Sequence, residues 1–349
     1  MSNPGAKESK NHGSYKLLNR IGQGGMARVY RAEHLADRSI VALKVFNKDD
    51  LTSPEFVKRI KREIATLKQC SHPNIVKVHG YALSSRGSYL ALHYIDGQTI
   101  DEAVEAEGRF STDRVVRLAR EMGGALAYCH ARGLIHRDIK PANIMIENGS
   151  GKAILLDFGV VKATNMTDIS VMDQVRGTLA YMSPEQFLNR PVDGRTDLYT
   201  LGLVLVKAAT GQEPFDQNKP MTLEDLTGNR PLPSVIERVP DFPEALEMLI
   251  HNCLMADPRE RYASAHDLLA DIEKVEAGEP VKSRARRRTT IRVKPKEFQP
   301  VVSTLRMDRR EALSGSVPVA LPTRKWIWML GLSPLLLLVA AAVVMMVVR

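Results

Sequence analysis

The spacing of apolar residues over the first hundred positions predicts strands, one helix and a further strand. Residues 15–45 have the pattern of β-strands. Ser53 and Pro54 then form a helix start, with Ser as the N-cap and Pro in the first turn. The apolar residues that follow recur on one helical face: Phe56, Val57, Ile60, Ile64 and Leu67. Residues 89–95 form another apolar strand, which ends at Asp96-Gly97.

Helices dominate the pattern after residue 110. Residues 112–132 are predicted to form a long helix with a single apolar stripe: Val115, Ala119, Met122, Leu126 and Cys129. Gly123 and Gly124 inside it each cost about 1 kcal/mol relative to Ala, which predicts close packing against a neighbour. A short apolar strand covers residues 153–156, and residues 246–255 and 265–275 form closing helices.

The pattern changes again near the C-terminus. Residues 278–325 combine basic residues with Pro, Ser and Thr and have little periodicity, so we expect a disordered linker. Residues 326–348 are an uncharged apolar run long enough to span a bilayer. A buried core helix is the alternative, but such helices are rarely apolar on every face. Trp326 and Trp328 fit the membrane interface, and Arg324 and Lys325 predict a cytoplasmic N-terminal side.

The charge is concentrated in this C-terminal region. The whole chain carries a net charge of +9, and residues 282–325 hold thirteen Lys and Arg against three acidic residues. The rest is nearly neutral, which favours anionic lipid near the linker as a partner and argues against nucleic acid. The three cysteines lie far apart in sequence, which excludes a cysteine zinc site and a disulfide framework. No secretory signal opens the sequence.

Residues 136–143 read His-Arg-Asp-Ile-Lys-Pro-Ala-Asn and carry the most specific chemistry. They follow Gly133, a candidate helix C-cap, and precede the apolar run 144–146, so we expect a loop fixed at both ends. Asp138 can accept a proton from a hydroxyl, Lys140 can neutralise a phosphate, and Asn143 can hold a hard cation. A solvated turn with a chance match is the alternative.

This stretch resembles the H-R-D-x-K-x-x-N catalytic loop of protein kinases at every fixed position. Asp157-Phe158-Gly159 resembles the D-F-G motif, Val41-Ala42-Leu43-Lys44 resembles the V-A-I-K strand, and Ser183-Pro184-Glu185 stands where A-P-E usually does. The motifs run in order from about residue 15 to about residue 275. The chain is similar to eukaryotic-type bacterial serine/threonine protein kinases with a C-terminal membrane anchor.

The resemblance implies an α+β fold of two lobes, a small β-rich N-lobe and a larger helical C-lobe. We expect an N-terminal tail over residues 1–14 and a kinase domain over residues 15–277. Within it lie the N-lobe (15–92), the hinge (93–97) and the C-lobe (98–277). A basic juxtamembrane linker (278–325) and a transmembrane helix (326–348) follow. The kinase domain would lie in the cytoplasm, tethered to the cell membrane.

ATP is the implied phosphoryl donor. Glycines in the turn over residues 22–27 let backbone N–H groups approach phosphate oxygens. Ala27 replaces the third glycine of the usual loop, and His93 replaces the usual Glu after the gatekeeper Leu92. Adenine would be read by the main chain of His93 and Ile95. The full set of implied ATP-binding residues is Ile21, Gly22, Gln23, Gly24, Gly25, Met26, Ala27, Arg28, Val29, Ala42, Lys44, Leu92, His93, Ile95 and Met145.

The resemblance also assigns roles in transfer to Ser or Thr hydroxyls. Asp138 would take the hydroxyl proton, and Lys140 would offset charge on the γ-phosphate. Asn143 and Asp157 would hold Mg²⁺, with Mn²⁺ as an alternative. Lys44 would position the α/β-phosphates, fixed by Glu63 from the inward face of its helix. Two supporting roles are also implied: Arg261 would pair with Glu185, and Asp197 would support the catalytic loop.

Three other functions fit parts of the sequence. A pseudokinase scaffold would be expected to lack Lys44, Asp138, Asn143 or Asp157, and all four are present. A small-molecule phosphotransferase would not need the complete activation segment through Glu185, which is a platform for a protein substrate. A membrane-tethered adaptor is compatible with kinase activity. The implied partners are protein substrates and a homodimer in which one copy phosphorylates the other.

Regulation by phosphorylation is expected at two places. Arg137 precedes the catalytic Asp and can pair with a phosphate on the activation segment. The candidate acceptors are Ser170 first, then Thr167 and Thr164, whereas Thr178 is expected to contact the catalytic loop. Thr289 and Thr290 follow three arginines in the linker, and phosphates there would loosen a basic tail from anionic lipid.

Overall fold

The computed structural model describes residues 11–24, 27–47, 54–84, 87–157, 180–215 and 233–284. The chain divides into two units, residues 1–291 and 292–349, and every described residue belongs to the first. Within these residues the strands come first and most of the helices follow, as the apolar pattern predicts.

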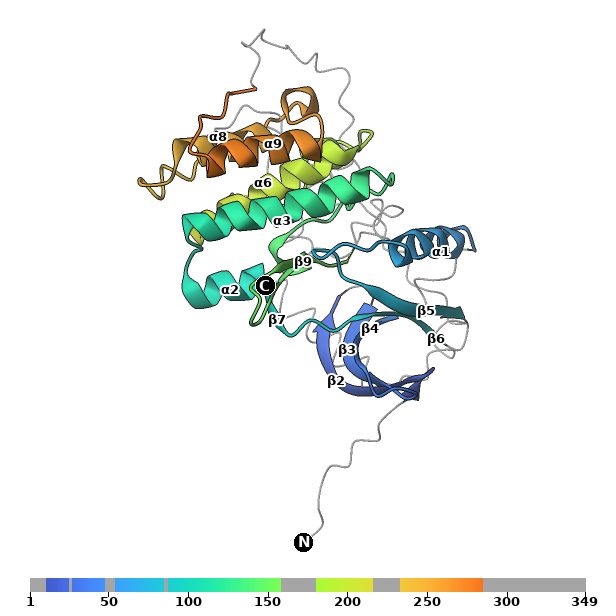
Figure 1. Cartoon of the computed structure of the whole chain (residues 1–349). Helices are drawn as coiled ribbons and strands as arrows, with labels where there is room; N and C mark the ends of the chain where they lie inside the picture. The colour runs from blue at the N-terminus through green and yellow to red at the C-terminus, as the bar shows by residue number, and fades with distance from the viewer. Residues whose placement is uncertain are drawn as a thin grey trace, which may run out of the picture. The chain divides into compact units, whose positions relative to one another are not determined.

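The N-lobe is a curled antiparallel sheet, drawn in blue in Figure 1, with strand order β1-β2-β3-β4-β6-β5. Alternate side chains of β4 take opposite faces, so Val41 and Leu43 are buried on one side. Helix α1 packs against β5 through Ile60, Ile64 and Leu67, the stripe that its sequence predicts. The elements are β1 (Asn11–His12), β2 (Tyr15–Gln23), β3 (Ala27–His34), β4 (Ile40–Phe46), α1 (Pro54–Lys68), β5 (Val78–Ser84) and β6 (Gly87–His93).

The C-lobe is built around one buried helix, α6, with a small sheet at its edge. From Thr196 to Val206 every side chain of α6 is buried, because α2, α3, α8 and α9 all contact it. The second sheet has the order β7-β8-β9. The elements are β7 (Gly97–Thr99), α2 (Ile100–Glu107), α3 (Thr112–His130), η2 (Pro141–Asn143), β8 (Ile144–Glu147), β9 (Ala153–Leu155), α5 (Pro184–Phe187), α6 (Gly194–Thr210), α8 (Glu244–Cys253), η3 (Pro258–Glu260) and α9 (Ala265–Glu276).

Of the two glycines inside α3, Gly123 lies at the close contact that its presence in a helix predicts. A Cβ at Gly123 would stand 3.1 Å from Cδ2 of Leu269 on α9. A Cβ at Gly124 would stand 3.7 Å from Nε2 of His72, in the connection between α1 and β5. Tight packing against α9 therefore offsets the helix-propensity cost of Gly123, whereas the contact at Gly124 has an ordinary van der Waals distance.

That same loop ties the N-lobe to the C-lobe. Asn74 Nδ2 donates to the backbone oxygen of Ala153 at 2.8 Å, and the amide of Val76 donates to Leu155 O at 3.0 Å. Tyr128 on α3 accepts a hydrogen bond from the amide of Ser71 at 2.9 Å. The loop is thus part of the C-lobe framework, and it fixes β9, which leads directly into Asp157.

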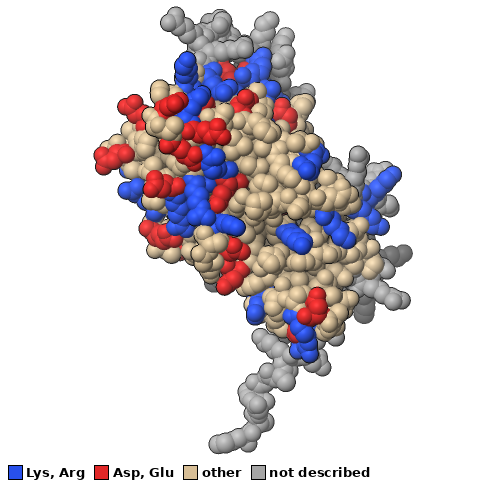
Figure 2. Space-filling model, in the orientation of Figure 1, with Lys and Arg blue, Asp and Glu red and all other residues tan. Residues whose placement is uncertain are grey.

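Acidic and basic side chains are mixed over the helical lobe on the face shown in Figure 2. Several form ion pairs between neighbouring turns or helices, such as Arg117 with Glu121 and Arg120 with Glu276. This mixture agrees with a nearly neutral folded part and a basic charge carried elsewhere in the sequence.

The described fold continues past α9 through residue 284, seven residues beyond the expected domain end at 277. The buried Asn252 of α8 holds this extension, because its Nδ2 donates to Lys282 O at 2.9 Å and its Oδ1 accepts from Arg284 N at 2.9 Å. The Arg284 guanidinium lies over the Tyr262 ring, 4.4 Å from its centroid. The start of the basic linker is therefore docked on the C-lobe.

Replacing Asn252 by Ala should release this docked segment. Two hydrogen bonds worth about 1 kcal/mol each would be lost, so trypsin should cut after Lys282 at least about tenfold faster. Time-resolved mass spectrometry of the tryptic fragments measures the rate, with His266→Ala on the exposed side of α9 as the control. Cleavage after Lys282 that is already as fast in the wild type as cleavage after Arg286 would contradict the docking.

Candidate active site

The catalytic loop begins where α3 ends and is held from below by α6. Gly133 has a positive φ of 70°, which fits its expected place after the helix. The fully buried carboxylate of Asp197 accepts from the amides of His136 at 2.9 Å and Arg137 at 2.8 Å. Its Oδ2 also lies 2.8 Å from Nε2 of His130. The structure thus places Asp197 in the supporting position that the sequence implies.

His136 joins the catalytic loop to the segment that carries Asp157. Its Nε2 lies 2.6 Å from the backbone oxygen of Leu156, and its Nδ1 lies 3.3 Å from the amide of Asp138. The Leu156 carbonyl can only accept in the first contact, and the Asp138 amide can only donate in the second. The ring is fully buried and fixes the spacing between the two loops.

Arg137 has a backbone conformation that L-residues resist. Its φ of 65° lies in the left-handed region, which costs of order 1–3 kcal/mol for a residue other than Gly. Its amide is bound by Asp197, and its carbonyl oxygen accepts from Nε2 of Gln186 on α5 at 2.9 Å. The loop is therefore held on both sides of this strained residue, directly before Asp138.

Asp138, Lys140 and Asn143 converge, as the loop sequence predicts. Asn143 Nδ2 donates to Asp138 O at 2.7 Å and to Asp138 Oδ2 at 3.0 Å. Lys140 Nζ lies 3.6 Å from the same Oδ2. A carboxylate, a cation and an amide therefore share one small volume, with side chains of Asp138 and Lys140 only 14% and 22% exposed.

Lys44 on β4 pairs with Asp157, and their side-chain nitrogen and oxygen are 2.8 Å apart. Burial favours the neutral acid, but the charge and hydrogen bond of Lys44 outweigh it, so the pKa of Asp157 lies below its ordinary value. The carboxylate is therefore ionised at neutral pH. Glu63, the expected partner of Lys44, lies on α1, but its side chain falls outside the described part of the structure.

Asn143 and Asp157 fit a magnesium site by their chemistry. The amide of Leu156 donates to Asn143 O at 2.8 Å, so the two motifs are adjacent. Asn143 uses its nitrogen toward Asp138, which leaves the side-chain oxygen as its ligating atom. One amide oxygen and one ionised carboxylate are hard ligands of the type that Mg²⁺ takes together with substrate phosphates.

The residues expected around ATP lie on β2, β3, β4, β6, β8 and the hinge. Ala42 on β4 pairs with Leu92 on β6, and Leu92 and Ile95 are buried. Ile21, near the end of β2, is 44% exposed. The remaining described members are Gly22, Gln23, Gly24, Ala27, Arg28, Val29, Lys44, His93 and Met145, whereas Gly25 and Met26 lie outside the described residues.

His93 is the hinge residue at which the sequence departs from the family pattern. The amide of His93 donates to Lys77 O at 2.8 Å, which anchors this residue to the segment before β5. Its side chain is exposed, and its ring lies 5.8 Å from the ring of His79. Replacing the usual Glu by His therefore places an exposed imidazole on the hinge.

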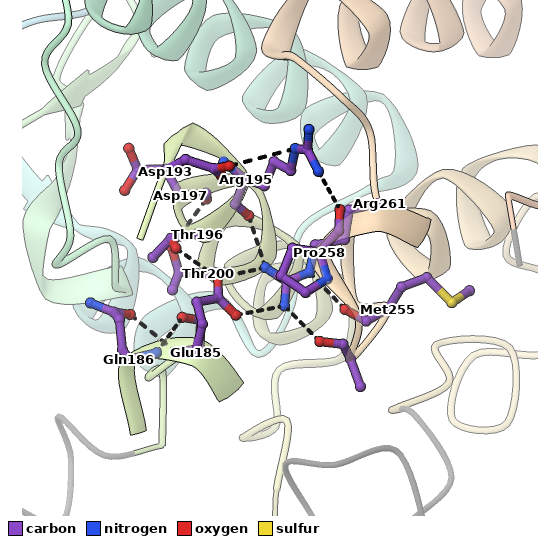
Figure 3. Close-up of polar contacts among 12 residues, drawn as sticks. Glu185, Gln186, Asp193, Arg195, Thr196, Asp197, Thr200, Met255, Pro258 and Arg261 are labelled. Carbon is purple, nitrogen blue, oxygen red and sulfur yellow. Dashed lines mark hydrogen bonds and ion pairs between the residues drawn. The ribbon is translucent and has the colours of Figure 1, made fainter. Parts of the chain in front are cut away.

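Glu185 and Arg261 form a buried, bidentate ion pair, drawn in Figure 3. The two guanidinium nitrogens lie 2.7 and 2.9 Å from the carboxylate oxygens. Thr196 donates to Glu185 at 2.6 Å, and Arg261 also donates to backbone oxygens, including Met255 O at 2.6 Å. Burial alone would raise the pKa of Glu185, but Arg261 and Thr196 lower it below its ordinary value.

A second polar cluster, which the sequence reasoning missed, holds the segment just before Ser183. The Tyr181 hydroxyl donates to Glu213 at 2.9 Å. Lys207 on α6 pairs with Glu213 and with Asp101 on α2. Burial and then Glu213 raise the pKa of Tyr181, so its hydroxyl keeps the proton that it donates. No short motif marks these residues, because they come from separate elements.

Several predicted residues lie outside the described part of the chain. They include Phe158, Gly159, Thr164, Thr167, Ser170, Thr178, Thr289, Thr290 and the apolar run 326–348. Among the described residues, no helix is both long enough and apolar enough to cross a bilayer.

The fold and the loop geometry define a protein kinase domain, and the family comparison confirms this prediction. Residues 15–271 match the protein kinase domain family, so the chain belongs to that family. ATP as the phosphoryl donor follows from this membership. The predicted two-lobed architecture is confirmed as well.

Among known proteins, the chain resembles bacterial serine/threonine-protein kinases. PrkC of Bacillus subtilis is 33% identical over 261 residues, covering 75% of this chain and 40% of PrkC. PknH of Mycobacterium tuberculosis is 34% identical over 258 residues, covering 73% of this chain and 41% of PknH. The crystal structure of the Mycobacterium tuberculosis PknI kinase domain matches with a TM-score of 0.62 and 25% identity, covering 77% and 99% of the two chains. This chain spans about two fifths of the length of the first two relatives.

Replacing Glu185 by Gln should lower the free energy of unfolding at pH 7 by about 3–5 kcal/mol, because Arg261 would stay buried without its counter-charge. The lowered pKa of Glu185 makes the pair's contribution complete above the ordinary value of 4.5 and lost as the pH falls through the lowered value. The difference between variant and wild type should therefore shrink in acid.

Urea unfolding at pH 7 and at successively lower pH measures this difference, with the exposed Glu105→Gln on α2 as the matched control. Wild-type stability in the Glu185 variant at pH 7 would show that the pair contributes nothing.

Proposed function

We propose that this chain transfers the γ-phosphoryl group of ATP to Ser or Thr hydroxyls of proteins. The observation that carries the proposal is the convergence of Asp138, Lys140 and Asn143 on one loop, with Oδ2 of Asp138 3.0 Å from Asn143 Nδ2 and 3.6 Å from Lys140 Nζ. The Lys44–Asp157 pair supports it, because it supplies a second cation and an ionised carboxylate beside the same loop.

In the proposed reaction, Asp138 orients the substrate hydroxyl and accepts its proton. The hydroxyl oxygen bonds to the γ-phosphorus while the bond to the β–γ bridging oxygen breaks, which leaves ADP. Lys140 offsets charge on the transferred group, and Lys44 holds the α/β-phosphates. Mg²⁺ held by Asn143 and Asp157 would neutralise phosphate charge when bound.

The preference for Ser and Thr rests on resemblance. Lys140 within the catalytic loop and the Gly177-Thr178 pair match the Ser/Thr class, and the named bacterial relatives are serine/threonine-protein kinases. Tyr181 and the buried pair of Glu185 with Arg261 support a firm platform for a protein substrate at the end of the activation segment.

Replacing Asp138 by Asn should remove nearly all phosphoryl transfer, because a general base contributes about 10²- to 10⁴-fold. The change is nearly isosteric, so the melting temperature should stay close to that of the wild type. Incorporation of label from γ-labelled ATP into the chain and into casein measures transfer, with Asp113→Asn on the exposed first turn of α3 as the control. Transfer at the wild-type rate would refute the assigned role of Asp138.

We also propose that a phosphate on the activation segment docks on Arg137. Its Nε is buried and has no hydrogen-bond partner among the described residues, which is costly for a charged group. Asp197 and Gln186 hold its backbone, so the position from which the Arg137 side chain extends is fixed. Ser170, then Thr167 and Thr164, are the proposed acceptors.

Mass mapping after incubation with ATP and Mg²⁺ should find phosphate on at least one of Ser170, Thr167 and Thr164. Phosphatase treatment should then lower the rate of phosphoryl transfer. Ser170→Ala should make this loss of activity smaller, with Ser150→Ala in the turn between β8 and β9 as the control. A fully active protein without phosphate between residues 164 and 170 would exclude the switch. The same map tests the linker residues Thr289 and Thr290.

Attachment to a membrane is the final part of the proposed function. The apolar run 326–348 would span the cell membrane with the kinase domain on the cytoplasmic side. The basic linker would lie against anionic lipid at about 1 kcal/mol per Lys or Arg near the surface. Two copies held in one membrane would phosphorylate each other as a homodimer.

A further inference from the structure

We propose that Gln186 is a positioning residue, which couples the substrate platform to the catalytic loop through a hydrogen bond to the Arg137 carbonyl. The inference deepens the proposed kinase function and rests on the role given to Asp138. Gln186 belongs to none of the motifs recognised in the sequence, yet its side chain reaches the residue before Asp138.

The carboxamide of Gln186 makes two different contacts with its two ends. Its Oε1 accepts from the amide of Ser183 at 3.2 Å, while the backbone amide of Gln186 donates to Ser183 Oγ at 3.3 Å. These reciprocal bonds are a capping box that starts α5. The Nε2 end is then left to donate to Arg137 O at 2.9 Å.

The two contacts need different chemistry. A capping box needs only an acceptor at this position, so Glu serves it as well as Gln. The bond to a backbone carbonyl needs a donor, which Gln has and an ionised Glu lacks. Local helix capping therefore does not explain why an amide rather than a carboxylate faces Arg137.

The carbonyl that Gln186 binds belongs to the peptide unit immediately before Asp138. The other side of this unit carries the amide of Asp138, which points to Nδ1 of His136 at 3.3 Å. Asp197 holds the Arg137 amide, so Gln186 supplies the second restraint on a residue whose φ is 65°. Rotation of this peptide unit would move the Asp138 carboxylate, and misplacement by about 1 Å can cost about 100-fold in rate.

The residue that provides this restraint is itself firmly anchored. Glu185, its neighbour on α5, is tied to Arg261 and Thr196 in the C-lobe core, as Figure 3 shows. Ser183, its capping partner, is fully buried. The Gln186 side chain thus joins the segment that ends the substrate platform to the loop that carries Asp138. Loss of the platform's order would loosen the loop.

Gln186→Glu separates positioning from capping. It should keep the capping box and the melting temperature but lower kcat for transfer to casein about 10- to 100-fold, with the KM for ATP changed less than twofold. Gln186→Met, which lacks both the donor and a charge, should lower kcat similarly and also destabilise α5. Gln212→Glu, in the turn after α6, is the matched control.

The outcomes are distinct. If Gln186→Glu and the wild type have the same kcat, Gln186 is only a capping residue and the inference fails. If Gln186→Met keeps full activity while Gln186→Glu does not, the added charge and not the lost donor causes the loss of activity, and the inference also fails. Absence of transfer by the wild type would instead refute the proposed function.

A second measurement does not depend on transfer. Hydrogen exchange at the Asp138 amide should be faster in Gln186→Glu than in the wild type, with exchange in α3 and α6 unchanged. Unchanged exchange at this amide would overturn the coupling even if no phosphoryl transfer could be measured.

Discussion

The catalytic loop depends on the hydrogen bonds that its backbone amides donate to the buried carboxylate of Asp197. The Asp197 side chain is fully buried, and its oxygens are bound by two loop amides and lie against the ring of His130. It also lies in the first turn of α6, where the helix dipole favours an anion. An uncompensated charge at this depth would cost several kcal/mol, so the loop amides and the carboxylate require each other. The loop is therefore part of the core.

Helix α6 links this support to the rest of the site. Thr196, directly before Asp197, donates to Glu185 and so joins the same helix to the pair with Arg261. Farther along, Lys207 reaches Glu213, which accepts from Tyr181. Both the loop that would hold the reacting hydroxyl and the platform for the substrate are thus fixed to one buried helix. Their relative position follows from packing in the C-lobe core.

The sequence predicted the parts whose spacing is local. The loop over residues 136–143, the tight packing at Gly123 and the order of strands and helices all follow from short patterns. The pair of Glu185 with Arg261 and the support from Asp197 needed the family resemblance, because the partners are far apart in sequence. Gln186 was missed because a capping box has the same signature with Glu or Gln. The Lys44–Asp157 pair and the docked residues 281–284 depend on tertiary packing that no local pattern encodes.

Backbone strain gives a physical reason for this concentration of buried contacts. Four described residues other than Gly have positive φ, and two of them belong to the proposed site: Arg137 directly precedes Asp138, and Asp157 is a proposed Mg²⁺ ligand. Each such conformation costs of order 1–3 kcal/mol, and it persists only where the surroundings determine it. Asp197 and Gln186 hold Arg137, and Lys44 holds the Asp157 carboxylate. These hydrogen bonds and this ion pair therefore keep the two strained residues, and the carboxylates of Asp138 and Asp157, in one arrangement.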